Sequence, residues 1–131
     1  MTRHLLAIAA LVCLSAPALA QPPSSMGQPP CLRQADIWSF NPVPGNRSLI
    51  AEDQRHRRYR VNFMGICSGL QFNMGLAFKT RGVGTLSCIS RGDSVLHRDV
   101  AGPPECIIQS VEWQTPALDK ADAEAKAAMH R

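Results

Sequence analysis

The residues best suited to carry chemistry in this 131-residue chain are its five cysteines. Cys13 lies in an N-terminal segment that looks like a cleaved export signal, which leaves Cys31, Cys67, Cys88 and Cys106. No Cys-x-x-Cys pair and no close Cys/His pair occurs, which argues against a zinc site or a thioredoxin-like redox pair. An even number of cysteines in an exported domain instead predicts two disulfides, with three possible pairings.

Among these pairings we expect Cys67–Cys88 and Cys31–Cys106. The first would close a local loop, and the second would join the two ends of the domain. Each could stabilise the fold by about 3 to 4 kcal/mol through loop-closure entropy.

Two arrangements could carry catalysis. Residues 65–69, Gly-Ile-Cys-Ser-Gly, match the nucleophile elbow of some hydrolases, but that elbow needs a large parallel sheet for which the chain is too short. His97 and Asp99 are two residues apart in a predicted strand and could form an oriented general base, yet their spacing identifies no nucleophile. A hydrolase would need a free thiol or an activated His97/Asp99 pair. We therefore expect no enzymatic activity, no catalytic residue and no cofactor.

Soft ligands suggest a different chemistry. His97 together with Met64 and Met74 could hold copper, although methionines in strands more often fill a core. The sequence predicts no metal site, and a small-ligand or metal carrier is the alternative function.

Arginines form the densest charged cluster, between residues 55 and 60. Such a cluster can hold a polyanion or an acidic partner, although Glu52 and Asp53 just before it partly neutralise it. The net charge of +4 would fall to +3 on loss of Arg3 with the signal, which makes nucleic acid an unlikely partner. We predict a non-enzymatic interaction or structural module that contacts a macromolecule of the cell envelope through Arg55, Arg57, Arg58 and Arg60.

The N-terminus carries the features of a secretory signal peptide over residues 1–20. Arg3 is followed by the apolar stretch 5–14 and by the small-x-small cleavage site Ala18-Leu19-Ala20. The apolar stretch is shorter than the roughly 20 residues of a membrane span. We therefore predict a periplasmic or secreted protein with no transmembrane segment in the mature chain.

Turn residues and period-two patterns predict the elements that position these side chains. Residues 21–30 are rich in proline and read as a linker, and residues 31–116 form one domain. Arg91-Gly92-Asp93 spells the integrin-binding tripeptide but reads as a tight turn between strands. The pattern predicts an all-β fold, a small antiparallel barrel or sandwich, with strands at 36–40, 48–51, 58–63, 74–79, 86–90, 95–100 and 106–113.

Alternation also predicts which side chains face the core. Tyr59, Val61 and Phe63 should point inward, and Trp38 should share a face with Phe40. After the last strand, Thr115-Pro116 resembles a helix cap followed by a first-turn proline. Residues 117–131 should form a short helical or frayed tail, since few large apolar side chains could anchor it.

An ordered set of short motifs in residues 31–113 resembles a family of small exported proteobacterial proteins of unknown function. The motifs are Cys31 before an Ile-aromatic strand, Arg47 before an aliphatic pair, Tyr59 opening a strand, Cys67-Ser68-Gly69-Leu70, Arg81-Gly82, Cys88 with Gly92-Asp93, and Cys106-Ile107. The chain differs at Ser68, where the family pattern has proline, and in placing Gly92-Asp93 some residues beyond Cys88 instead of directly after it. The resemblance implies export and a framework of four cysteines, and it implies no activity or ligand.

Overall fold

A computed structural model describes residues 27, 29–70, 75–97 and 105–131. The predicted signal peptide at 1–20 and most of the predicted linker lie outside the described residues, as do Met74 and Asp99. Among the described residues, no helix is long and apolar enough to cross a membrane.

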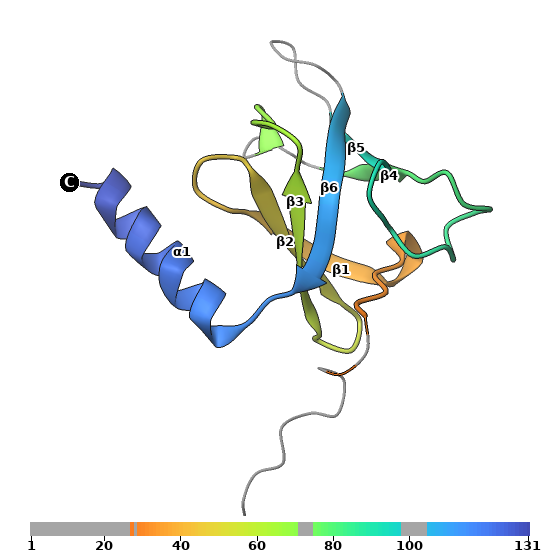
Figure 1. The fold of residues 1–131 in the computed structure, drawn as a ribbon, viewed down its shortest axis with the longest axis horizontal. Coiled ribbons are helices and arrows are strands. Elements are labelled where there is room, and N and C mark those ends of the chain that lie inside the picture. The colour runs from red at the N-terminus through yellow and green to blue at the C-terminus, as the bar shows by residue number, and fades with distance from the viewer. Residues whose placement is uncertain (1–26, 28, 71–74, 98–104) are drawn as a thin grey trace, which may run out of the picture.

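One curled antiparallel sheet forms the body of the protein (Figure 1). Its strands lie in the spatial order β1-β2-β3-β6-β5-β4, and each pairs with its neighbours in antiparallel orientation. The predicted all-β antiparallel fold is therefore confirmed, with the sheet curled into a half-barrel. The strands are β1 (Ile37–Pro42), β2 (Ser48–Asp53), β3 (Arg58–Phe63), β4 (Ala77–Lys79), β5 (Ser94–Leu96) and β6 (Glu105–Trp113).

The core lies against one face of this sheet. Tyr59, Val61 and Phe63 of β3 are all buried, as their alternation predicts. They pack with buried side chains from the neighbouring strands and from the segments that flank the sheet, including Leu32, Leu49, Leu70, Ile89, Val95 and Ile108. The opposite face of β3 carries polar side chains, which leaves that face available for a second layer.

Two local predictions are wrong. Trp38 is exposed, whereas Phe40 packs against the core, because a bulge between Ile37 and Ser39 breaks the alternation along β1. Residues 86–90 do not form a strand, since only one isolated bridge joins Cys88 to Arg33. In that segment Leu86 is exposed and Ile89 is buried, so alternation is present without a strand partner along its length.

The disulfide pairing also differs from the prediction. The bonds are Cys31–Cys88 and Cys67–Cys106, not Cys67–Cys88 and Cys31–Cys106. Strand register gives the reason: Met64 N–H donates to Ile107 O just after the end of β3, which brings Cys67 beside Cys106. Likewise Ile89 N–H donates to Leu32 O, next to the Cys31–Cys88 bond.

Helix α1 (Pro116–Met129) follows the sheet and gives the predicted tail a defined structure. The Thr115 side chain caps it by accepting from Leu118 N–H, and Pro116 occupies the first turn, as the sequence predicts. The helix buries none of its residues. Its described contacts with the sheet are mainly ion pairs, so the strength of these pairs determines how stably the helix docks.

Candidate functional site

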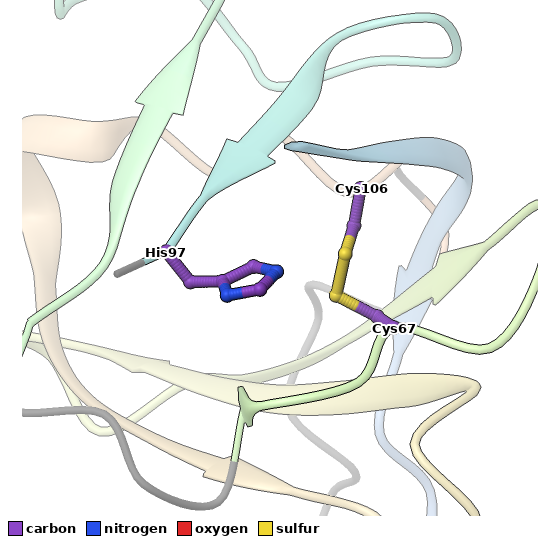
Figure 2. A group of neighbouring side chains, drawn as sticks. All are labelled: Cys67, His97 and Cys106. Atoms are coloured by element: carbon purple, nitrogen blue, oxygen red, sulfur yellow. A yellow bond between two sulfur atoms is a disulfide. The ribbon is translucent and has the colours of Figure 1, made fainter. Parts of the chain in front are cut away.

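A buried histidine faces the Cys67–Cys106 disulfide (Figure 2). One ring nitrogen of His97 and the two sulfur atoms all lie within 4.8 Å of one another, and all three residues are buried. Within the described residues, these three side chains are the one group of potential metal ligands whose donor atoms lie close to one another.

Strand register places each member of this group. Val95 of β5 pairs with Cys106 of β6, so His97, two residues further along, projects toward the same side of the sheet. Cys67 reaches the group from the segment after β3, which runs beside β6. Three segments that are distant in sequence thus meet at one corner of the sheet.

The His97 ring has no hydrogen-bond partner among the described residues, at either Nδ1 or Nε2. Its side chain is buried, with a relative exposure of 5%. A buried polar group without a partner costs about 1 to 3 kcal/mol, and the large majority of buried side-chain polar atoms in proteins have a hydrogen-bond partner. Among the described residues the His97 ring is therefore an exception, and another favourable interaction should offset the free-energy cost of its unpaired nitrogens.

A pocket of about 280 Å³ opens beside the same disulfide. Cys67 and Cys106 both line it, together with Met64 and Ile66, whose side chains are more than half exposed. The disulfide is therefore bordered by the pocket and by the His97 ring. Met64, which the sequence analysis considered as a soft ligand, lies at this pocket, whereas Met74 lies outside the described residues.

While the disulfide is closed, Cys67 has no thiol that could act as a nucleophile. Gly69 in the same motif has a positive φ of 87°, and the sheet around it is antiparallel, whereas a nucleophile elbow belongs to a parallel sheet. The proposed His97/Asp99 pair involves a residue outside the described range, so that pair stays a prediction.

The four arginines of the predicted contact surface lie in different surroundings. Arg58 pairs with Asp119 at 2.7 Å and Arg60 with Asp122 at 2.9 Å, so both bind helix α1. Arg57 pairs with the buried Asp53. Arg55 donates its backbone N–H to Asp53, and no ion pair of its side chain occurs within the described residues. That these arginines contact a partner stays a prediction.

Asp53 is a buried acceptor for several donors around the β2–β3 turn. Its carboxylate accepts from the backbone N–H groups of Arg55 and Arg57, from Arg57 Nε at 2.7 Å and from the Tyr59 hydroxyl at 3.2 Å. Burial raises the pKa of Asp53, but the hydrogen bonds and the Arg57 charge outweigh it and lower the pKa overall. Burial and the Asp53 charge raise the pKa of Tyr59. From the sequence Asp53 stands out only as a charge next to the arginines, so this role was not predicted.

Asp119 connects α1 to the sheet through two donors. Arg58 and the Gln114 amide both donate to its carboxylate, and these hydrogen bonds lower its pKa. The contacts of Asp119 and Asp122 were not predicted either, because a helix with few apolar residues gives no signal of where it docks.

The pH dependence of this contact follows from the direction of the pKa shift. A carboxyl group with a lowered pKa contributes stability above its unfolded pKa, and loses it as the pH falls through the lower folded value. We expect the contact of Asp119 with Arg58 to stabilise the docked helix at neutral pH, and this contribution to be lost progressively as the pH falls below about 3.8, the ordinary pKa of Asp. A carboxyl NMR titration measures this directly, and an Asp119 pKa equal to that in an isolated peptide of residues 114–131 would contradict it.

The Arg91-Gly92-Asp93 tripeptide forms a turn, not an exposed ligand. Asp93 is buried, and its carboxylate accepts from the backbone N–H groups of Arg81 and Ser90. Gly92 has a φ of +85°, and the Arg81 guanidinium covers it. The interpretation as a tight turn agrees with this geometry.

Comparison with known proteins identifies a family but no activity. No curated protein and no solved structure shows a significant match to the chain. A family of unknown function (DUF6491) matches residues 1–130, nearly the whole sequence. The chain therefore belongs to this family of unknown function, DUF6491.

Proposed function

We propose that this protein is an exported, non-enzymatic interaction module that binds an acidic segment of another envelope protein through the outer face of β3. The observation that supports this most is the way α1 lies on that face. Asp119 and Asp122 of the helix contact Arg58 and Arg60, so two carboxylates of the chain itself already occupy these arginines. Two disulfides are consistent with an oxidising compartment, as export would require.

The contacts that hold α1 on the sheet are of a kind that a partner could form in its place. It buries no residue, and an exposed ion pair such as Arg58–Asp119 contributes only about 0 to 1 kcal/mol. The Arg60–Asp122 pair is more shielded, with side chains 14% and 16% exposed. A pocket of about 540 Å³ separates its C-terminal end, at Lys126 and Met129, from the β1–β2 turn. An acidic partner could therefore displace α1 if its own carboxylates pair with both Arg58 and Arg60.

The sequence predicted one binding surface of four arginines, but their contacts show that these arginines have different roles. Arg58 and Arg60 project from β3 opposite the buried Tyr59 and Val61, and they form the proposed binding face. Arg57 neutralises the buried Asp53, so its replacement would test stability instead of binding. A binding experiment should therefore leave Arg57 unchanged.

Retention on immobilised polyglutamate tests the proposal. Arg58→Gln with Arg60→Gln should abolish retention at physiological salt. Arg91→Gln with Arg131→Gln, which removes the same charge from exposed positions outside β3, should leave most of it. Equal retention of both double variants would contradict the proposal.

A second pair of variants tests whether α1 competes with the partner. Asp122→Asn removes the contact with Arg60 and should strengthen retention, whereas Glu124→Gln removes the same charge from an exposed position of the same helix and should change retention less. If the two variants are retained equally, only net charge matters and the helix does not compete.

A further inference from the structure

We propose that Cys67, Cys106 and His97 bind a zinc ion when the Cys67–Cys106 disulfide is reduced, so that this corner of the sheet holds either a disulfide or Zn²⁺. This site is separate from the arginine face of β3 and does not depend on the function proposed above. The donors are already close, since one His97 nitrogen and both sulfurs lie within 4.8 Å of one another.

The unpartnered imidazole points to a ligand. Both nitrogens of the buried His97 ring lack hydrogen-bond partners among the described residues, and the ring is directed at the disulfide (Figure 2). A neutral imidazole nitrogen is a common metal ligand, and metal binding would repay the cost of leaving it unpaired. The disulfide sulfurs are poor ligands, so the ring can be satisfied in this way only after reduction.

Reduction supplies the two missing ligands. A dithiol reductant transfers two electrons and two protons to the disulfide, which breaks the S–S bond, gives two thiols and leaves the reductant as a disulfide. Zinc binding then releases both thiol protons and forms two Zn–S bonds and one Zn–N bond. A tetrahedral site with bonds of about 2.0 to 2.3 Å places its donors about 3.5 Å apart. The two sulfurs, which are bonded to each other in the disulfide, therefore have to separate after reduction, whereas the His97 nitrogen already lies within 4.8 Å of them.

Charge and space favour Zn²⁺ over a monovalent ion. Two thiolates and a neutral imidazole balance the charge of Zn²⁺, whereas Cu⁺ would leave a net negative charge in a buried site, which is costly. The pocket of about 280 Å³ lined by Cys67 and Cys106 has room for a water molecule as the fourth ligand. A site with three protein ligands and an open position is the usual arrangement of an accessible zinc ion.

Native mass spectrometry of the full-length chain, with one equivalent of Zn²⁺, tests the site. We expect one zinc ion per chain after reduction by a phosphine, which becomes a phosphine oxide in the presence of water, and no zinc in the oxidised chain. Reduced protein that binds no zinc, or oxidised protein that binds as much as reduced protein, would overturn the proposal.

Matched variants identify the ligands. Cys67→Ser with Cys106→Ser should abolish zinc binding, whereas Cys31→Ser with Cys88→Ser, which removes the other disulfide, should retain it after reduction. His97→Phe keeps an aromatic ring without nitrogen ligands and should weaken the affinity at least about tenfold. Equal zinc affinity of the two double-serine variants would place the ion elsewhere and overturn the proposal.

A rate measurement on the unmodified chain avoids any dependence on how the variants fold. Because zinc binds only the reduced form, it should slow the re-formation of the Cys67–Cys106 bond by oxidised glutathione, measured by alkylation and peptide mapping. The Cys31–Cys88 bond should form at the same rate with and without zinc. Re-formation of both bonds at rates that zinc does not change would contradict the proposed site.

Discussion

Replacing Asp53 with alanine should lower the free energy of unfolding by about 3 to 5 kcal/mol, because it leaves the donors of the β2–β3 turn without their shared acceptor. The carboxylate side chain is 2% exposed, and it accepts from two backbone N–H groups, from the Arg57 guanidinium and from the Tyr59 hydroxyl. Urea unfolding followed by far-UV circular dichroism measures the loss.

An exposed ion pair of the same protein provides the control. Arg33–Asp36 has a similar separation in sequence, but its side chains are 40% and 27% exposed, so Asp36→Ala should cost less than about 1 kcal/mol. If Asp53→Ala and Asp36→Ala destabilise the protein equally, burial does not strengthen the Asp53 contacts.

Titration gives an independent measure of the same interaction. The pKa of Asp53 is lowered overall, so its charged form stabilises the fold above the ordinary carboxyl range, and this stability is lost as the pH falls through the lower folded value. Asp53→Asn keeps the shape of the side chain but removes its charge. The difference in stability between the wild type and Asp53→Asn should therefore shrink below about pH 3.8.

The sequence predicted those parts of the fold that depend on local patterns. The alternation of Tyr59, Val61 and Phe63 identified β3 and its buried face, and Thr115-Pro116 marked the start of α1. Trp38 was placed on the wrong face because a one-residue bulge reverses every later side chain, and no local residue type signals the bulge.

Parts of the site that depend on contacts between distant segments were not predictable. The sequence marks His97 as a histidine in an alternating strand. Its spatial neighbours, Cys67 and Cys106, follow from the pairing of β5 with β6 and of β3 with β6. The same register sets Cys67 beside Cys106. Loop length favoured a different pairing, because it measures the entropy of the unfolded chain and carries no information about which strands are neighbours. The docking of α1 on Arg58 and Arg60 was hidden for the same reason.

Loss of either disulfide should destabilise the protein by about 4 kcal/mol. The bonds join residues 57 and 39 positions apart, and loops of these lengths give nearly equal losses of entropy in the unfolded chain. For a domain of this size, such a loss lowers the melting temperature by about 15 to 30 °C. Calorimetry of the variants Cys31→Ser/Cys88→Ser and Cys67→Ser/Cys106→Ser, each with the other bond intact, measures both effects.

The interpretation of these variants depends on which cysteines are paired, so the disulfide pairing should first be established by peptide mapping. Cleavage after Lys and Arg places the four cysteines in separate peptides, so non-reduced fragments should link Cys31 to Cys88 and Cys67 to Cys106. A Cys67–Cys88 link would instead contradict the register between β3 and β6. Because the two closed loops overlap in sequence, each remaining bond still joins one end of the domain to its middle. Removal of one bond should therefore leave a folded but weakened protein.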